Sequence, residues 1–549
     1  MKLTDLDCKQ KEVVEAVVSC DERVLALGGP GTGKTTTALW TARTFLDTSI
    51  QALTTRVLFL TFSRAAVGQV MSRSPGVLSA VSSRVDILTF HALAYRLLRA
   101  FGRYAGYGTA PPSVQSETHI KLFGHDRAHL SYDDLLTGAT RLLQVSQAVS
   151  RLVGTRWGLV ICDEVQDTNR KQWEFLQLIA AAKLLLLGDV NQMIYTFIPG
   201  VSPEWFQWIR QWADREITLL PRSHRDPSGA IPALAEAVRV RDFRSAAVAE
   251  ALRTDRLTIH FDTNVYSHSD VVVSEIRKAQ KLGSENVGVF VHSNEAVAEM
   301  AEVLNDAGVD HALIGIPEAH AEALGAMAMQ CGFAVGLTED QQVRQALALF
   351  LTASGRRRQV PLIAQALIGR GTLPGLVENA IQSLERALSA AAGGTLQELA
   401  EVAAGSWGRL AIAGGRRSWQ RASRHFRRLV APLFNERVSQ ESVRAVLRIV
   451  ERSRVEALVD RDYSERGRVK LMNYHQTKGR EADTVIHVFR SEDYFGQEVE
   501  PFEKTSRLLN VAISRARRRV VVILPPDPHP LVAPFRELRD AQRPSVLMS

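Results

Sequence analysis

Residues 28–35 read GGPGTGKT, a complete G-x-x-x-x-G-K-[ST] pattern that can bind phosphate. Glycines let the backbone curl so that successive N–H groups point at the β-phosphate, the lysine reaches the β- and γ-phosphates, and the next hydroxyl binds Mg²⁺. The apolar run 24–27 predicts a strand before the loop, and residues 35–45 predict a helix after it, whose N-terminal dipole favours an anion. We therefore expect Lys34 on the phosphates and Thr35 on the metal ion. The glycine spacing differs from that of dinucleotide-binding folds.

A second candidate element lies far downstream, where the apolar run 158–162 ends in Asp163 and Glu164. A carboxylate at the C-terminal end of a buried strand can hold Mg²⁺ opposite Thr35, and the adjacent carboxylate can orient and deprotonate an attacking water. A solvated acidic turn is the alternative interpretation. The phosphate-binding loop in the same chain favours the catalytic one, so the sequence predicts hydrolysis of a nucleoside triphosphate.

The segment DEVQDTN at 163–169 resembles motif II of the UvrD/Rep-type helicases of superfamily IA. Other blocks similar to the motifs of that family follow in order over almost the whole chain. Gln10, ahead of the phosphate-binding loop, resembles the glutamine that reads adenine in the family. The blocks that resemble motifs Ia, Ib, III, IV, V and VI are residues 59–66, 88–93, 187–195, 220–226, 471–483 and 510–517.

The resemblance implies a site for ATP and Mg²⁺ between two lobes. Arg225 and Arg515 match arginines that stabilise transition-state charge on the γ-phosphate, Gln192 matches a γ-phosphate sensor, and Glu481 stands where relatives hold the ribose. The expected metal ligands are Thr35 and Asp163. The expected catalytic residues are Lys34, Asp163, Glu164, Gln192, Arg225 and Arg515, and the expected nucleotide-binding residues are Gln10, Gly29, Gly31, Thr32, Gly33, Lys34, Thr35, Thr36, Arg225, Glu481 and Arg515.

The resemblance also implies a track for single-stranded DNA. Tyr195 and Phe197 flank Thr196 and are placed to offer bases a stacking surface, which tolerates any sequence. Motifs Ia and Ib line the strand in relatives. The expected nucleic-acid-binding residues are Phe62, Thr89, His91, Tyr195, Phe197 and His475.

Several positions depart from the family pattern. His224 stands where relatives carry an aromatic residue, Ile198 where they carry an arginine, and Arg480 where they carry a leucine. The phosphate-binding loop is similar to that of superfamily IB, some of whose members act on RNA. Motifs II and V are closer to superfamily IA, so the resemblance implies DNA and 3′→5′ movement.

Strand-like runs alternate with helical patterns in two sets, which predicts parallel sheets with helices on both faces. We expect an α/β fold with two tandem RecA-like P-loop NTPase domains and two mainly helical insertions. The two sets of runs are 24–27, 57–62, 85–90, 158–162, 183–187 and 217–220, then 257–261, 287–291, 469–473, 484–489 and 519–524.

The predicted domains follow from these sets and from the resemblance. Because the given sequence ends soon after motif VI, we expect no fused nuclease domain. We assign residues 1–92 and 151–218 to ATP-binding domain 1A, 93–150 to insertion 1B, 219–320 and 461–549 to domain 2A, and 321–460 to insertion 2B.

In the second insertion, arginines interleave with Trp407, Trp419 and Phe426. On a helix, the arginines at 417, 421, 424 and 428 share one face by their i, i+3/i+4 spacing. This stripe could grip duplex phosphates, or it could be a solvated face or a patch that docks an acidic partner. The GRRR segment at 355–358 is expected to be a solvated turn.

The bulk composition fits these expectations. The net charge of +8 and the pI near 9.4 favour polyanionic partners. The four cysteines are scattered, which argues against a disulfide framework or a zinc ribbon. The charged N-terminus lacks the apolar stretch of a secretory signal, and the apolar runs are too short to span a membrane. We expect a cytoplasmic protein.

The sequence therefore predicts an ATP-dependent translocase and helicase that acts on single-stranded DNA and on junctions between single and double strands. The alternative is an ATPase subunit, stimulated by nucleic acid, that remodels protein–DNA complexes or regulates a nuclease partner without unwinding. A third hypothesis, a DNA-binding module without hydrolysis, is disfavoured by the intact Lys34, Asp163 and Arg515.

Overall fold

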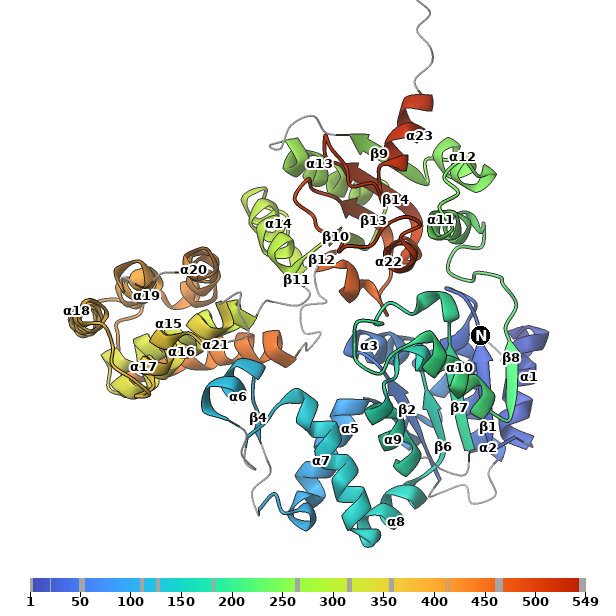
Figure 1. The fold of residues 1–549 in the computed structure, drawn as a ribbon, viewed down its shortest axis with the longest axis horizontal. Helices are drawn as coiled ribbons and strands as arrows, with labels where there is room; N and C mark the ends of the chain where they lie inside the picture. The colour runs from blue at the N-terminus through green and yellow to red at the C-terminus, as the bar shows by residue number, and fades with distance from the viewer. Residues whose placement is uncertain are drawn as a thin grey trace, which may run out of the picture. The chain divides into compact units, whose positions relative to one another are not determined.

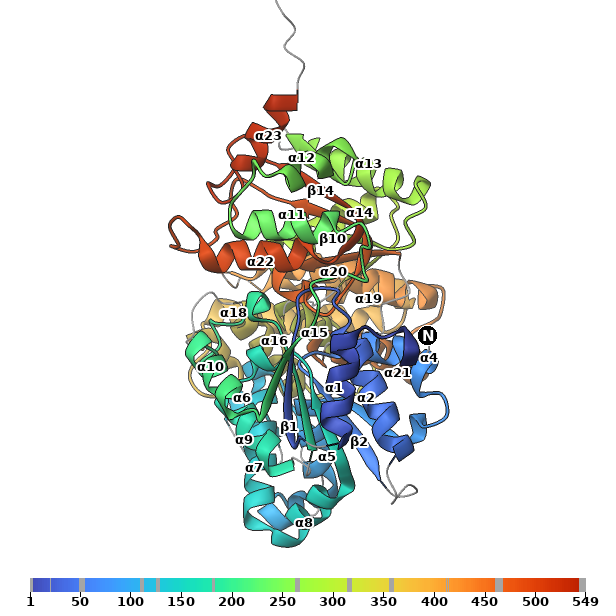
Figure 2. The same ribbon diagram turned by 90° about the vertical axis from the view of Figure 1, so that its right-hand side faces the viewer.

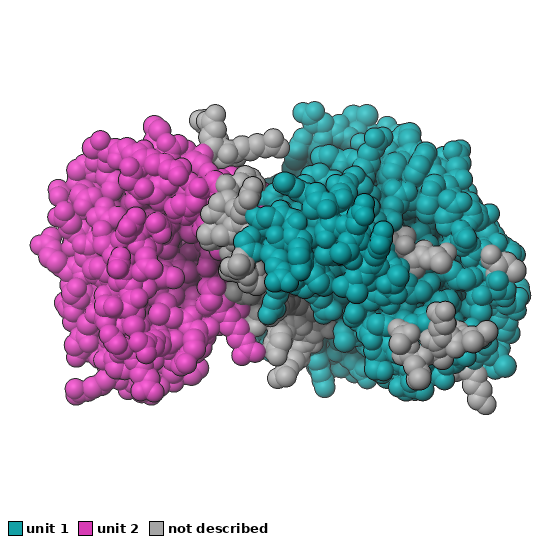
Figure 3. All heavy atoms as spheres, turned by 90° about the horizontal axis from the view of Figure 1, so that it is seen from below, with its two compact units in different colours: residues 1–112, 133–314, 464–549 teal, residues 113–132, 315–463 magenta. Residues whose placement is uncertain are grey.

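The computed structural model falls into two compact units (Figure 3). Unit 1 comprises residues 1–112, 133–314 and 464–549, and unit 2 comprises residues 113–132 and 315–463. No helix in the described part of the chain is long and apolar enough to cross a lipid bilayer. The described residues are 3–19, 21–48, 55–108, 113–124, 129–179, 183–261, 267–313, 318–354, 360–410, 412, 414–459 and 468–542.

The first sheet of unit 1 is parallel and has the strand order β3-β2-β6-β7-β1-β8 (Figure 1). Its central strands are nearly continuous apolar runs because helices bury them on both faces. Such strands place the loops at their C-terminal ends along one edge, where ligands bind in open α/β sheets. The strands are β1 (Arg23–Leu27), β2 (Arg56–Thr61), β3 (Val85–Thr89), β6 (Trp157–Cys162), β7 (Lys183–Gly188) and β8 (Arg215–Thr218).

Helices α1 and α2 cover one face of this sheet, and α9 and α10 cover the other (Figure 2). Alternate residues of each strand enter the core beneath α1 and α2 because successive side chains point to opposite faces. Thr89 caps the N-terminus of α5, which follows β3 directly. This sheet and its helices are called the first lobe. The helices are α1 (Cys8–Ser19), α2 (Lys34–Thr48), α3 (Arg64–Arg73), α4 (Pro75–Leu78), α5 (Phe90–Phe101), α7 (Tyr132–Val145), α8 (Gln147–Arg156), α9 (Arg170–Ile179) and α10 (Pro203–Trp212).

The second sheet of unit 1, which with its helices is called the second lobe, is also parallel, with the order β11-β12-β10-β13-β14-β9. Its two faces carry separate cores, one beneath α11, α12 and α22 and one beneath α13 and α14. The elements are β9 (Leu257–Phe261), β10 (Val287–Val291), β11 (His311–Leu313), β12 (Val469–Asn473), β13 (Ala482–Val488), β14 (Ala516–Leu524), α11 (Ala230–Arg239), α12 (Ala246–Arg253), α13 (Ser267–Lys281), α14 (Asn294–Asp306), α22 (Glu503–Ile513) and α23 (Pro534–Gln542).

The prediction of two parallel α/β sheets with mainly helical insertions is confirmed, since each predicted strand-like run overlaps an observed strand. The run predicted at 217–220 is displaced, because β8 occupies Arg215–Thr218. The edge strand β11 was not predicted. It has three residues, too few for a periodic pattern to be recognised.

Unit 2 is helical and is built around α15 (Glu318–Ala334), which contacts α16, α18, α19, α20 and α21. Alanine and glycine dominate α15, and small side chains allow neighbouring helices to approach its backbone closely. A two-stranded ribbon of β4 (Ser113–Val114) and β5 (His129–Leu130) completes the unit. The other helices are α6 (Glu117–Phe123), α16 (Asp340–Ser354), α17 (Leu362–Leu367), α18 (Gly375–Ala391), α19 (Leu396–Gly405), α20 (Arg416–Val430) and α21 (Gln440–Val459).

The aromatic residues of the predicted basic stripe are core residues instead. Trp407, Trp419 and Phe426 are buried in the core of unit 2. The Trp419 indole donates to Ala404 O at 2.9 Å, which satisfies its polar group inside the core. The exposed face of α20 therefore presents arginines such as Arg424 without interleaved aromatic rings. The side chain at position 417 and the 355–358 turn lie outside the described residues.

We predict that Phe426→Ala destabilises unit 2 by about 3–5 kcal/mol, because it leaves a cavity in a close-packed core. Gln420→Ala, on the exposed face of the same helix, is the matched control and should change stability by less than about 0.5 kcal/mol. Urea denaturation followed by tryptophan fluorescence measures both variants. Equal stability of the two variants would contradict the placement of Phe426 in the core.

Candidate functional site

The loop between β1 and α2 forms a cradle at the C-terminal edge of the first sheet. Gly31 and Gly33 have φ values of +79° and +89°, a conformation that glycine adopts most readily. A Cβ atom on Gly31 would lie 2.5 Å from Ser223 Oγ, so a larger residue does not fit there. The loop backbone can therefore curl around an anion at the N-terminus of α2.

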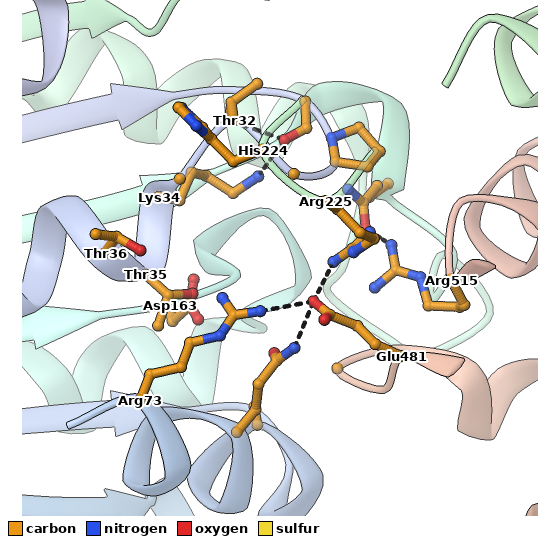
Figure 4. A pocket seen from close by; sticks show the side chains of 18 of the residues that line it. Thr32, Lys34, Thr35, Thr36, Arg73, Asp163, His224, Arg225, Glu481 and Arg515 are labelled. Carbon is orange, nitrogen blue, oxygen red and sulfur yellow. Dashed lines mark hydrogen bonds and ion pairs between the residues drawn. The ribbon is translucent and has the colours of Figure 1, made fainter. Parts of the chain in front are cut away.

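A cavity of about 440 Å³ opens over this loop (Figure 4). Loops of both sheets of unit 1 contribute to its walls. Residues 69 and 73 of α3 and His224 also line it, as does the turn at 479–481. Of the predicted catalytic and nucleotide-binding residues, the cavity brings together Gly29, Gly31, Thr32, Gly33, Lys34, Thr35, Thr36, Asp163, Glu164, Gln192, Arg225, Glu481 and Arg515.

Gln10 is the predicted nucleotide-binding residue that does not line the cavity. Its side chain is 1% exposed and lies behind the loop, where Nε2 donates to Thr32 O at 3.2 Å. Its Oε1 accepts from the Asp7 amide at 3.1 Å. In this arrangement Gln10 supports the backbone of the phosphate-binding loop.

Lys34 points into the cavity. Its Nζ donates to the carbonyl oxygens of Gly28 and Gly29 and lies 3.8 Å from Asp189 Oδ2. Charge-assisted hydrogen bonds to phosphate are stronger than bonds to neutral carbonyls. Lys34 is therefore held where a phosphate could compete for it.

Asp163 and Glu164 follow β6 directly. Asp163 Oδ1 accepts from the Glu164 amide at 3.0 Å, and Glu164 has a strained φ of +55°. Burial raises the pKa of Asp163, and the negative charge of Glu164 raises it further. Burial alone would also raise the pKa of Glu164, but Lys478 and Lys34 lower it. A divalent cation held by Asp163 and Thr35 would offset the cost of burying the aspartate charge.

Lys478 was missed by sequence reasoning. It is buried, pairs with Asp167, and lies 3.4 Å from Glu164 Oε2, while its Nζ donates to Gln192 O at 2.9 Å. Burial would lower the pKa of Lys478, but Asp167 and Glu164 raise it above its usual value. Its position in the block that resembles motif V, residues 471–483, could have identified it as a candidate site residue. The pairing itself joins residues more than 300 positions apart.

Two predicted arginines reach the cavity from the second lobe. Arg225 donates to Glu481 Oε1 at 2.7 Å and to Ser514 O at 2.6 Å. Arg515 donates to Gln192 Oε1 at 2.9 Å. Burial and the nearby Arg225 lower the pKa of Arg515 to about 10, so Arg515 stays charged at neutral pH.

Glu481 is the centre of a set of ion pairs (Figure 4). Oε1 accepts from Arg225 at 2.7 Å and from Arg73 at 2.8 Å, and Oε2 accepts from Arg517 at 2.8 Å. Gln69 adds a bond of 2.7 Å. Burial opposes its charge, but these cations hold the pKa of Glu481 well below its usual range. Sequence reasoning missed Arg73 and Gln69. Both lie on α3, and the sequence of that helix does not indicate that they contact Glu481.

Four of the predicted nucleic-acid-binding residues form one cluster. Phe62 stacks on Tyr195 with ring centroids 5.1 Å apart, and Phe197 meets His475 edge-on at 5.1 Å. The Tyr195 hydroxyl donates to His475 O at 3.0 Å. Phe197 is 65% exposed, so its ring is available to a base. Gln192 lines the cavity and contacts Arg515, and it precedes Tyr195 of this cluster by three residues. The cluster and the cavity are therefore adjacent along the chain.

Thr89 has a structural role at the start of α5. Its side chain is 2% exposed, and its hydroxyl accepts from the Ala92 amide at 3.1 Å as the N-cap of α5. His91 is half-buried in the first turn of the same helix. Both lie at the C-terminal end of β3, beside Thr61 at the end of β2.

The chain matches the family model described as "UvrD/REP helicase N-terminal domain" over residues 9–125 and 118–202. The ATP-dependent DNA helicase PcrA of Leuconostoc citreum is 21% identical over 370 residues, which cover 55% of this chain and 49% of that protein. The ATP-dependent DNA helicase UvrD2 of Mycobacterium tuberculosis is 27% identical over 296 residues, 41% of this chain and 42% of that protein. The chain thus matches about half, or less, of the length of these relatives.

The matched region contains the phosphate-binding loop, the acid pair, Gln192 and the aromatic residues Phe62, Tyr195 and Phe197. The family model therefore covers the part of the first lobe from which most of the cavity is built. Over residues 9–202, the chain is therefore similar to the N-terminal domain of the UvrD/REP helicases.

Proposed function

We propose that this chain hydrolyses ATP and uses the hydrolysis to move 3′→5′ along single-stranded DNA and to unwind duplex at a junction. The observation that carries the proposal is the convergence of the phosphate-binding loop, an acid pair and two arginines in one cavity. Lys478 and Gln192 connect that cavity to the aromatic cluster. The names of the relatives, which are ATP-dependent DNA helicases, support the same substrate.

The proposed chemistry follows from the positions of the side chains. The loop amides and Lys34 hold the β- and γ-phosphates, and Glu164 orients a water and accepts its proton. Asp163 and Thr35 would hold Mg²⁺, which neutralises phosphate charge. Arg515, which is buried and charged, stabilises the charge of the transition state.

The proposed coupling uses the contacts between the lobes. A γ-phosphate would attract Arg225 and Arg515 toward the loop of the first lobe and so favour closure of the cleft. The same movement changes the contacts of Gln192, three residues before Tyr195. Closing and opening would then alternate the grip of the aromatic cluster on the bases.

We further propose that the two sheets of unit 1 correspond to domains 1A (residues 1–92 and 151–218) and 2A (219–320 and 461–549). Residues 93–150 and 321–460 would be the insertions 1B and 2B. The exposed arginines of α20 support a contact of the second insertion with duplex phosphates.

Replacement of Glu164 by glutamine should lower the rate of ATP hydrolysis at least about a hundredfold, because it removes the general base. The hydrolysis rate is measured with and without single-stranded DNA or RNA. Glu174→Gln, an exposed position on α9, is the control and should leave the rate unchanged. If no nucleic acid stimulates hydrolysis by the wild-type protein, the proposal of movement along DNA is contradicted. That result would favour an ATPase subunit activated by a protein partner.

Phe197→Ala should weaken binding of an oligothymidylate about 5- to 150-fold, because one base loses a stacking partner worth about 1–3 kcal/mol. Fluorescence anisotropy of a labelled oligonucleotide measures the affinity. Tyr104→Ala removes another exposed aromatic ring, outside the cluster, and serves as the control. Unchanged affinity of Phe197→Ala would refute the assignment of the cluster to base stacking.

Strand displacement should require a 3′ single-stranded tail on the duplex and should fail with a 5′ tail, because 3′→5′ movement carries the motor toward the junction only in the first case. A gel assay with matched tailed duplexes tests this. DNA-stimulated hydrolysis without displacement from either substrate would instead support the remodelling of protein–DNA complexes.

A further inference from the structure

A second cavity of about 570 Å³ lies in unit 1, near the end of the strands opposite to the candidate nucleotide site. It is bounded by the N-terminal ends of β2 and β6, by Asp86 and Leu88 of β3, and by the helices α5 and α8. A pocket of this size can hold a small organic molecule. The candidate nucleotide site lies at the C-terminal edge of the same sheet and shares no lining residue with this cavity, so the two cavities are distinct.

The charges around this cavity do not balance. Three arginines line it, Arg56, Arg96 and Arg156, with one acid, Asp86. Asp86 is already engaged, because Arg56 pairs with both of its oxygens at 2.8 and 3.0 Å and the Trp157 indole donates to it at 2.9 Å. The lining therefore carries two more positive than negative charges.

The two surplus cations lie at accessible positions. The Arg156 side chain is half exposed and forms only a long ion pair with Asp86, at 3.7 Å, because Arg56 already holds both oxygens of that carboxylate. Its guanidinium stacks over Trp157 at 5.5 Å, which positions it against an apolar surface. Arg96 lies on the exposed side of α5 at the wall of the cavity. Both can offer charge-assisted hydrogen bonds to an anion.

The rest of the wall is mostly apolar. Leu93, Leu97 and Phe101 project from α5, and Leu152 and Val153 project from α8. Leu152 is 55% exposed. An apolar wall beside two arginines matches a ligand that has an apolar body and one negatively charged end.

We propose that this cavity binds a small amphipathic organic anion, with its carboxylate, sulfonate or phosphate on Arg96 and Arg156 and its apolar body against Leu97 and Leu152. The site is separate from the proposed function and does not rest on it. Because Thr89 caps α5 and β6 leads to Asp163, the ligand would contact two elements that also position candidate functional residues.

The test uses octanoate as the probe and 1-octanol, which has the same apolar body without the charge, as its control. Isothermal titration calorimetry of the whole protein should show binding of octanoate and at least about tenfold weaker binding of octanol, because charge-assisted hydrogen bonds are lost. Displacement of 8-anilinonaphthalene-1-sulfonate by octanoate would show that an aromatic anion shares the site. Equal binding of octanoate and octanol would overturn the proposal.

Two pairs of variants locate the site. Arg96→Ala and Arg156→Ala should each weaken octanoate binding about tenfold, whereas Arg99→Ala and Arg151→Ala, on the same helices but outside the cavity lining, should not. Ala100→Trp, at an exposed position of the cavity wall, should block binding of both probes. Circular dichroism confirms that each variant is folded. Binding that survives Ala100→Trp in a folded protein would place the ligand elsewhere and overturn the proposal.

Discussion

Charge removed from water has to be balanced by other charge, and this requirement decides how the two lobes of unit 1 are joined. Lys478 is buried, and its partners Asp167 and Glu164 belong to the first lobe. Arg515 is buried too and reaches Gln192 of the first lobe at 2.9 Å. Removing one partner of such a buried pair lowers the free energy of unfolding by about 3–5 kcal/mol. The lobes therefore meet through the residues nearest the candidate chemistry, and a ligand that changes the charge beside Glu164 changes the contact between the lobes.

Those parts of the fold and site that depend on short stretches of chain could be predicted from the sequence. Strands β1, β6 and β7 are buried on both faces, so each is a run of apolar residues that needs no partner to be recognised. The cradle at 28–35 is equally local, because its glycines, lysine and hydroxyl fall within eight consecutive residues. Asp163 was predictable because it directly follows a strand.

Contacts that join distant segments could not be predicted in the same way. Nothing in the helix containing Gln69 and Arg73 shows that both face Glu481, some 400 residues later. The misassigned aromatics of α20 have a different cause. Trp419 and Phe426 lie seven residues apart, which is two helical turns and the spacing of a core stripe. Arg421 and Arg424 lie between them and favoured the interpretation as a surface, although each is two positions from one of the aromatic residues and so lies on another side of the helix.

Glu481 shows why a satisfied site can still respond to a ligand. Its carboxylate accepts hydrogen bonds from Arg73, Arg225 and Arg517, so these arginines are already ion-paired before a phosphate binds. A phosphate that binds Arg225 has to compete with Glu481, and only the difference between the two interactions favours closure. Such an exchange replaces one charge-assisted pair by another and leaves no buried charge unbalanced. Because Arg73 lies on the first lobe and Glu481 on the second, the exchange acts on the contact that joins them. Closure of the cleft between the lobes would therefore depend on small differences in free energy between strong interactions, so the cleft could both close and reopen in each cycle.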